Sequence, residues 1–395
     1  MTRNIIGSIK LEPDASAPSA AKGVMYFDSG TDKLKISEDG ATFVNLGAGS
    51  ATYDAVVAAS GGDYTTLGAA ITGGATSIFI KDGTYAETGA ITLPANCTLV
   101  GESKTGTIIN MQTNLLTIGE GNTLQNFHIK SSRDITLVQC SGNNILIFNC
   151  IIENTLATAS VDTGACVAID DGVGRTGNRI IGCKIIVFSG TVDNPNKRGI
   201  QGTSASARFQ IDNCEIIGAG SSYQVYAFYL VAEWCNLTNL RIVDFGKTAT
   251  DFVFLGFSRN SNYSDWVFEN CVGKVTVDSN SNYCNFVNWE DFTGAVSISN
   301  ECDFVHYTNI HLVGTFTAVA TGIQPQISNS SFDGGMSIAA NRTMINNSRV
   351  GATAGGGANT ITITGAANDV LITNTFVDAA ISDGGTGTVS DTVVY

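Results

Sequence analysis

Residues 360–377 read TITITGAANDVLITNTFV, and this stretch decides the fold that the sequence predicts. Apolar and polar residues alternate over 360–363, a turn of Gly, Ala, Asn and Asp follows, and a second apolar run at 370–372 leads to Asn374. Alternation with a period of two, broken by such turn residues, is typical of short strands. The stretch therefore predicts strands joined by tight turns.

The frame Asn-x-x-apolar that begins at Asn374 recurs along the chain. Its members are Asn126, Asn149, Asn213, Asn239, Asn270, Asn288, Asn309, Asn329, Asn347 and Asn374, with Gly182 in one further place. Asn270 and Asn288 are imperfect copies. These positions span 248 residues in ten steps, or roughly 25 residues per step. A period of this size indicates a solenoid built from one supersecondary unit per repeat.

Three short strands in about 25 residues form one coil of a parallel β-helix, with coils stacked about 4.8 Å apart. Asparagine tolerates the left-handed backbone of a tight corner, and its amide can bond to the coils above and below. The sequence thus predicts an all-β, right-handed parallel β-helix of about 12 to 13 coils. The alternative is an antiparallel sandwich with asparagine-rich turns.

Charge and hydropathy exclude two classes of partner. The 395 residues carry a net charge of −14 with a pI near 4.5, and no basic cluster interleaved with aromatic residues occurs. Nucleic-acid binding depends on clustered Lys and Arg. No apolar run approaches the roughly 20 residues of a membrane span, and the first residues lack the apolar core of a signal peptide. We expect neither nucleic-acid binding nor membrane insertion.

The ten cysteines do not have metal-ligand spacing. Cys150, Cys183, Cys214 and Cys271 each follow a repeat position and should point inward, as a core ladder in a protein made in a reducing compartment. The alternative is disulfide bonds between coils. Asp170-Asp171-Gly172 is an acidic turn, but a single acidic pair is weak support for a calcium site. We expect no metal and no cofactor.

Residues 1–50 differ from the repeats. Residues 23–40 predict two short strands around a turn, 42–46 a third strand, and 13–21 a linker. So small a β unit needs oligomerisation or a host surface for stability. The pattern Gly-x-x-Tyr-Phe-Asp-x-Gly-x-x-x-Leu-x-x-Ser-x-Asp-Gly at 23–40 resembles the amino-terminal attachment modules of bacteriophage tail fibres and tailspikes. The resemblance implies that residues 1–50 dock onto tail or baseplate proteins of a virion.

Residues 53–110 predict an amphipathic helix at 64–71 and then strands at 78–80, 83–87 and 97–102. This order resembles the entry of pectin-lyase-like β-helices, in which a helix covers the open end of the first coil. Covering that end protects unpaired strand edges. We therefore divide the chain into an attachment module (1–50), a capping helix with the first coils (51–115) and a β-helix body (116–395).

Two segments, Gly83–Glu87 and Asp251–Gly256, also resemble signatures of pectinesterases, in which Asp251 would be the nucleophile. The family's Gln-Asp-Thr acid/base triplet and its Leu-Gly-Arg-Pro-Trp arginine segment do not occur here. A nucleophile without its acid/base partner cannot run the two-step chemistry. We therefore reject esterase activity and interpret Asp251 as a turn residue.

The second residue after each repeat position should point outward. This row is His128, Ile151, Lys184, Glu215, Arg241, Val272, Glu290, His311, Ser331, Arg349 and Phe376. Lys184, Glu215 and Arg241 should form a ladder of exposed ion pairs about 5 Å apart. The two glutamates would lie three coils or roughly 14 Å apart, beyond the reach of a glycosidase pair. We interpret this row as a solvated face.

Residues 223–292 hold 16 of the 33 aromatic residues and all three tryptophans. Carboxylates stand beside indoles there, and an apolar platform with a few polar groups is typical of a ligand site. The candidate carbohydrate-binding residues are Glu233, Trp234, Trp266, Trp289, Glu290 and Asp291. The alternative is that these aromatic residues fill a wider core.

Taken together, the chain resembles a bacteriophage tailspike or tail-fibre protein, a family that is usually homotrimeric. The resemblance implies a virion protein, assembled in the host bacterial cytoplasm, that adheres to a bacterial surface polysaccharide. Flat walls rich in Ser and Thr suit packing around a threefold axis. A tailspike depolymerase with carboxylates from adjacent subunits, a structural virion fibre or decoration protein, and a secreted polysaccharide lyase are the alternatives.

Overall fold

The computed structural model describes residues 53–394, except for a set of short segments, and the strands of the first 50 residues. The segments outside the description are 113, 133–135, 157–163, 170–174, 190–196, 203–207, 219–224, 247–249, 257, 293–294, 320–322, 352–360, 366, 378–380 and 385–388. The acidic turn at 170–172 therefore lies outside the described residues. The chain divides into two compact units, Met1–Asp54 and Ala55–Tyr395.

The first unit contains a four-stranded sheet. Its strands are β1 (Pro13–Asp14), β2 (Met25–Asp28), β3 (Lys33–Ile36) and β4 (Val44–Asn45). The sheet pairs β2 with β3 and β3 with β4 antiparallel, as the sequence predicts for residues 23–46, and pairs β1 with β2 in parallel. The start of the expected linker is thus part of the sheet.

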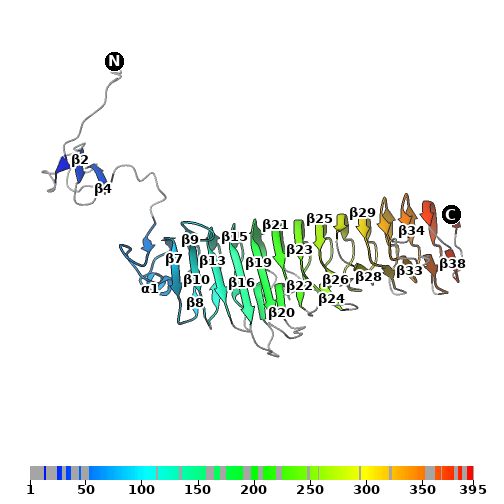
Figure 1. The fold of residues 1–395 in the computed structure, drawn as a ribbon, viewed down its shortest axis with the longest axis horizontal. Coiled ribbons are helices and arrows are strands. Elements are labelled where there is room, and N and C mark those ends of the chain that lie inside the picture. The colour runs from blue at the N-terminus through cyan, green and yellow to red at the C-terminus, as the bar shows by residue number, and fades with distance from the viewer. Residues whose placement is uncertain are drawn as a thin grey trace, which may run out of the picture. The chain divides into compact units, whose positions relative to one another are not determined.

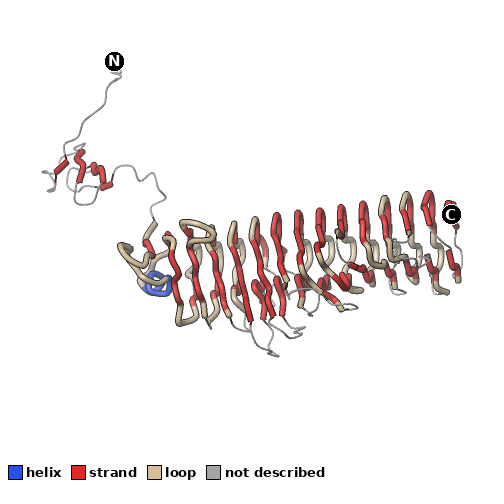
Figure 2. The backbone as a smooth tube through the Cα atoms, viewed as in Figure 1, coloured by secondary structure: helices blue, strands red, loops and turns tan. Residues whose placement is uncertain are grey.

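The second unit is a parallel β-solenoid, and it matches the predicted class of right-handed β-helix. Coils follow one another along a single axis, with strands of successive coils side by side (Figures 1 and 2). A 13-stranded sheet forms one wall. Its strands are β8 (Ile91–Thr92), β11 (Leu116–Ile118), β14 (Val138–Cys140), β17 (Gly164–Ile169), β20 (Lys197–Gly202), β22 (Tyr226–Val231), β24 (Asp251–Gly256), β26 (Val272–Val277), β28 (Ala295–Asn300), β30 (Phe316–Ala318), β33 (Met336–Ile338), β36 (Ile361–Ile363) and β38 (Ile381–Asp383).

A 22-stranded sheet forms the remaining walls. Its strands are β5 (Ala55–Val57), β6 (Ser77–Ile80), β7 (Gly83–Ala86), β9 (Thr98–Gly101), β10 (Thr107–Asn110), β12 (Thr123–Gln125), β13 (His128–Ser131), β15 (Leu146–Phe148), β16 (Ile151–Leu156), β18 (Thr176–Ile181), β19 (Lys184–Ser189), β21 (Arg208–Ile217), β23 (Asn236–Val243), β25 (Asn262–Glu269), β27 (Asn285–Asp291), β29 (His306–Leu312), β31 (Gln326–Ser328), β32 (Ser331–Phe332), β34 (Met344–Asn346), β35 (Arg349–Val350), β37 (Leu371–Val377) and β39 (Val389–Val394). In six coils a single bent strand runs along two walls. These strands are β21, β23, β25, β27, β29 and β37.

Each of these strands bends at a residue with left-handed backbone. At the bend two successive side chains face outward, and the inward–outward alternation then starts again. In β23, Leu237 and Leu240 point into the core, while Thr238 and Asn239 between them both face outward. Asn239 has φ of 53°. An L-residue with a branched or bulky side chain avoids this conformation, whereas Asn and Gly adopt it readily. The repeat therefore favours Asn, Asp or Gly at this corner.

This asparagine corner is a continuous column. Strand register aligns Asn126, Asn149, Gly182, Asn213, Asn239, Asp265, Asn288, Asn309, Asn329, Asn347 and Asn374, all at positive φ. Hydrogen bonds between side-chain amides join several neighbours. For example, Asn149 Nδ2 donates to Asn126 Oδ1 at 3.0 Å, and Asn309 Nδ2 donates to Asn288 Oδ1 at 3.0 Å. The predicted column is confirmed at all but one place.

Asn270 is the exception. The strand register aligns Asp265, and not Asn270, with the asparagines of the neighbouring coils. Asp can occupy this corner because it also tolerates the left-handed conformation. Asn270 lies at another corner, where its Nδ2 donates to Asp244 Oδ1. Val267 therefore replaces Val272 in the outward row, paired with Arg241 and Glu290.

All ten cysteines are buried. Cys150, Cys183 and Cys214 follow corner residues, as predicted, and each thiol donates to the carbonyl oxygen two residues earlier, at 3.3 to 3.4 Å. Ser330 and Ser348 make the same bond, at 2.8 Å, in later coils. A small side chain that packs in the core and donates a hydrogen bond to its own backbone suits this position. Cys in the early coils and Ser in the later coils both meet this requirement.

One end of the solenoid carries helix α1 (Leu67–Thr72), close to the helix predicted at 64–71. Leu67 is buried, Thr66 caps the helix, and the Glu87 carboxylate accepts from the N–H groups of Leu67 and Gly68 at 2.7 and 3.2 Å. The described residues include no helix with the length and hydrophobicity of a transmembrane segment.

Candidate carbohydrate-binding site

Three of the six candidate residues belong to the core. Trp266 and Trp289 expose 0% and 1% of their surface, stack at 4.6 Å, and donate their indole N–H groups to buried carbonyl oxygens at 3.1 Å. Asp291 is also buried, and its carboxylate accepts from the N–H of Val296 at 3.0 Å. These residues fill a wide core and present no surface to a ligand, which corrects their assignment as binding residues.

The other three are accessible but do not form one cluster. Glu290 is exposed on the outward row that follows the asparagine corner. Glu233 and Trp234 lie at a different corner, which precedes β23, and Trp234 exposes 52% of its surface. The structure therefore retains Glu233 and Trp234 as the start of a candidate site.

The corner of Trp234 is a second column, which in most coils lies two residues before the first wall strand. Gly177 lies at a β-bulge inside β18, and Arg208 is the first residue of β21. It contains Asn96, Gly121, Asn144, Gly177, Arg208, Trp234, Asn260, Tyr283, Phe304, Gln324, Arg342 and Asp369. Every member except Arg208 has positive φ. The early coils use Asn or Gly here, which carry little strain in this conformation.

Three members of this column are aromatic. Trp234, Tyr283 and Phe304 have φ of 57°, 61° and 54°. Bulky residues rarely adopt this region, at a cost of roughly 1 to 2 kcal/mol each. Backbone outliers of this kind are often retained for function. We call the run Arg208, Trp234, Asn260, Tyr283 and Phe304 the aromatic corner.

The rings of the aromatic corner form a platform. Tyr283 exposes 57% of its surface and stacks on Phe304 with centroids 5.1 Å apart and planes 4° from parallel. Trp234 lies two coils away, about 10 Å along the axis. Flat apolar faces spaced in this way can pack against the C–H faces of successive sugars in an extended chain.

Charged groups flank the platform. The Arg208 guanidinium lies over the Trp234 ring, 5.4 Å from its centroid. Arg259 Nη1 lies 3.7 Å from Glu233 Oε1, and Arg259 Nε donates to the carbonyl oxygen of Asn280 at 3.3 Å. Rings bounded by guanidinium and carboxylate groups combine apolar stacking with donors and acceptors for hydroxyls.

Sequence reasoning missed Arg208, Tyr283 and Phe304. A signal existed, because Asn96-Cys97, Trp234-Cys235 and Tyr283-Cys284 are three copies of one corner followed by an inward cysteine. An aromatic residue in a place that Asn fills elsewhere marks the unusual coils. That alignment needs the second corner to be recognised as a separate column.

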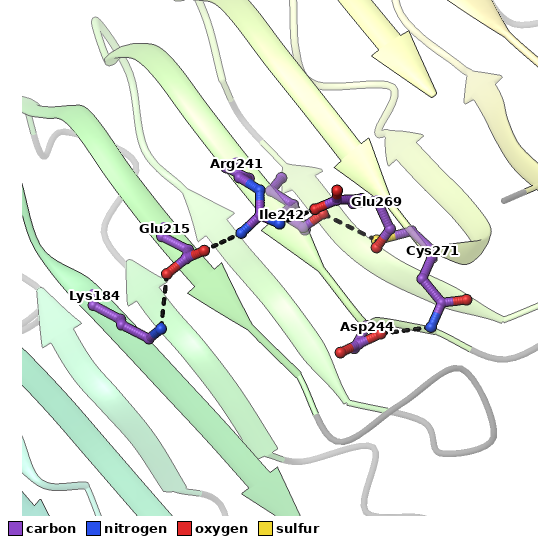
Figure 3. Close-up of polar contacts among 8 residues, drawn as sticks. Lys184, Glu215, Arg241, Ile242, Asp244, Glu269 and Cys271 are labelled. Atoms are coloured by element: carbon purple, nitrogen blue, oxygen red, sulfur yellow. Dashed lines mark hydrogen bonds and ion pairs between the residues drawn. The ribbon is translucent and has the colours of Figure 1, made fainter. Parts of the chain in front are cut away.

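The outward row forms the predicted ion-pair ladder. Lys184 Nζ lies 2.9 Å from Glu215 Oε2, and Arg241 bridges Glu215 to Glu269 (Figure 3). Partial burial opposes ionisation of Glu215, but Lys184 and Arg241 outweigh it and lower the pKa of this carboxyl. Exposed pairs of this kind contribute under about 1 kcal/mol each. The ladder is a structural feature of the surface and has no group available for chemistry.

The remaining acidic groups of the described residues include one pair on adjacent coils. No three His, Cys, Asp or Glu side chains in the described part of the chain gather as a metal site. Asp251 begins β24, not a turn, and its carboxylate accepts from the Thr276 hydroxyl at 2.8 Å. Asp278 and Glu301 follow β26 and β28 and so lie on adjacent coils. Burial, and then the charges of Asp278 and Asp251, raise the pKa of Glu301.

Several solved structures are similar to this fold. Tailspike protein 3 of bacteriophage CBA120 is 13% identical, with 83% of this chain and 57% of that chain covered and a TM-score of 0.48. The pre-mature gene product 12 of bacteriophage phi29 is 12% identical, with 82% and 54% covered and a TM-score of 0.37. The A-module of mannuronan C-5 epimerase AlgE6 from Azotobacter vinelandii is 11% identical, with 83% and 92% covered and a TM-score of 0.37.

No protein-family model and no curated protein sequence matches the chain. The chain spans a little over half the length of the two phage proteins to which it is similar. At these identities the similarity describes the fold, so the function is argued from the residues of this chain. The protein is a parallel β-solenoid similar in fold to a phage tailspike protein, to a second phage protein and to a glycan-active enzyme.

Proposed function

We propose that this chain is an adhesion protein of a bacteriophage virion that binds a bacterial surface polysaccharide through the aromatic corner. The observation that carries the proposal is the placement of Trp234, Tyr283 and Phe304 at left-handed positions that Asn or Gly occupies in the early coils. The strain of these residues and the exposure of Trp234 and Tyr283 are disfavoured by folding alone. Contact with a sugar chain would offset both.

The attachment-like pattern at residues 23–40 supports the virion setting of the proposal. We infer that residues 1–50 bind tail or baseplate proteins and that the chain assembles as a homotrimer. Light scattering coupled to size exclusion measures the assembly directly. We expect a species of three times 41.2 kDa, and a monomer would contradict the fibre proposal.

Binding is tested on an array of bacterial surface polysaccharides with the full-length protein. We expect the double variant Trp234→Ala/Tyr283→Ala to bind its glycan at least about tenfold more weakly, since aromatic anchors dominate such sites. Phe292→Ala is the matched control, because Phe292 exposes 56% of its surface outside the aromatic corner. Equal binding by the double variant and the wild type would refute the proposed site, and no glycan binding at all would favour a structural virion fibre.

A glycan-cleaving depolymerase is the second candidate, and Asp278 with Glu301 favours it. A carboxyl of raised pKa with a second acidic group on the adjacent coil is the arrangement that a general acid and its partner require. Incubation with the bound glycan, followed by assays for new reducing ends and unsaturated uronates, tests this activity. Products made by the wild type and lost in Glu301→Gln would establish cleavage; an intact glycan leaves adhesion as the function.

A further inference from the structure

A groove of about 880 Å³ runs over four coils near the carboxyl end of the solenoid. The asparagine corner and the outward row line it: Asn309, Asn329, Asn347 and Asn374 with His311, Ser331, Arg349 and Phe376. The groove and the aromatic corner lie on different corners and overlap in a single coil, which holds Phe304 and Asn309.

The amide column changes inside this groove. Asn309 Nδ2 donates to Asn288, and Asn374 Nδ2 donates to Asn347 Oδ1. Between them, the side chain of Asn329 and the Nδ2 group of Asn347 make no hydrogen bond to the described residues. Both side chains are exposed. The groove therefore offers donors and an acceptor that the other coils use to hold the column together.

The floor beneath these amides is fixed. Ser330, Ser348 and Thr375 are buried, and each hydroxyl donates to the carbonyl oxygen two residues earlier, at 2.8, 2.8 and 2.9 Å. The N–H groups of Ile310 and Ser330 also donate to hydroxyls of the next coil, at 3.1 and 3.3 Å. A floor held in this way positions the exposed amides before a ligand arrives.

The lining of the groove differs from the acidic surface of the chain. The chain has 35 acidic and 21 basic residues, yet none of the twelve lining residues is acidic. Glu290, the acidic neighbour of His311 in the outward row, lies one coil outside the lining. Arg349 is exposed, and its guanidinium lies 6.0 Å from the centroid of the Phe376 ring. Guanidinium groups bind carboxylate and phosphate through paired charge-assisted hydrogen bonds.

We propose that this groove is a second binding site and that it takes an acidic saccharide. The oxyanion of the sugar binds Arg349, its hydroxyls bond to the amides of Asn329 and Asn347, and one sugar face packs on Phe376. The aromatic corner pairs a guanidinium with the Glu233 carboxylate, whereas no carboxylate lines the groove, so the groove should select the more acidic sugar. The inference does not depend on glycan binding at the aromatic corner.

The test is titration calorimetry of the full-length protein with three probes. A galacturonate hexamer carries carboxylates, a phosphorylated mannan fragment carries phosphates, and the methyl-esterified galacturonate hexamer carries no charge. We expect binding of at least one acidic probe and none of the ester. Arg349→Gln should weaken that binding at least about tenfold, the size of a charge-assisted hydrogen bond.

Arg342→Gln is the matched control, because Arg342 is an exposed arginine of the same coil outside the groove. It should leave the affinity within about twofold, as should Trp234→Ala/Tyr283→Ala, which separates this site from the aromatic corner. Asn329→Gly removes the amide but suits the left-handed backbone (φ of 51°), so it should weaken binding with little change in the unfolding midpoint. Binding of neither acidic probe, equal binding of the ester, or an unchanged affinity in Arg349→Gln would overturn the proposal.

Discussion

The middle coils and the last coils of the solenoid fill the same inward position with different residues. After the asparagine corner, the middle coils place Leu240, Trp266 and Trp289 in the core, whereas the last coils place Ser330, Ser348 and Thr375 there. Coil length does not follow this difference, because 26 residues separate Asn213 from Asn239, 18 separate Asn329 from Asn347, and 27 separate Asn347 from Asn374. Close packing instead implies a wider core around the stacked rings of the middle coils than around the hydroxyls of the last coils, which bond to their own backbone.

The largest expected effect breaks the wide core. Trp289→Ala removes a ring stacked on Trp266 at 4.6 Å and in edge contact with Phe286 at 5.0 Å. The resulting cavity should lower the free energy of unfolding by about 3 to 5 kcal/mol. Ser348→Ala in the narrow core should cost only about 1 kcal/mol. Urea unfolding followed by tryptophan fluorescence and circular dichroism compares the two, and equal losses would contradict the idea that core width sets the residue.

The fate of the tryptophans shows what sequence can and cannot predict. Trp266 and Trp289 follow Asp265 and Asn288, as Cys150 follows Asn149, so the rule that predicts inward cysteines also places these indoles inside. The high content of aromatic residues in 223–292 led to their assignment as binding residues, although this alternation places them in the core. The column of corners was predictable, because left-handed backbone restricts the residue type. Asn270 was misassigned because two corners of one coil both accept asparagine, and only strand register distinguishes them.

The asparagine corner gives the second prediction. Asn239 has φ of 53° and donates to Asp212 Oδ1 at 3.0 Å. Asn239→Ala keeps the left-handed backbone under strain and should cost about 1 to 2 kcal/mol, whereas Asn239→Gly should cost less, because glycine adopts this conformation freely. Midpoints of thermal unfolding measure the difference. An alanine variant as stable as the glycine variant would show that the corner is not confined by its backbone.

At the aromatic corner we expect a substitution to raise the free energy of unfolding, whereas Asn239→Ala lowers it. Trp234→Asn replaces a strained, exposed ring with the residue that Asn96 and Asn144 supply at the same corner. Relief of strain, less the lost contact with Arg208, should raise the free energy of unfolding by about 1 kcal/mol while glycan binding falls. Phe148→Asn is the control, since Phe148 is exposed on strand β15 at ordinary φ and should gain nothing. A destabilised Trp234→Asn would mean that the ring serves the fold.

The smallest expected effect concerns the ion-pair ladder of Lys184, Glu215, Arg241 and Glu269. Lys184 and Arg241 lower the pKa of Glu215 despite its partial burial. A carboxyl with a depressed pKa in the folded state stabilises the protein above its unfolded pKa of about 4.3, and that contribution disappears as the pH falls through the folded value. Glu215→Gln should therefore cost under about 1 kcal/mol at pH 7 and nothing at lower pH, once the carboxyl is protonated in both states. Unfolding midpoints of the wild type and the variant across this range should converge on acidification.

The exposed Glu290, which stands opposite His311 in the same row, supplies the matched Glu290→Gln comparison. A gap that persists into acid would place the role of Glu215 in packing instead of charge.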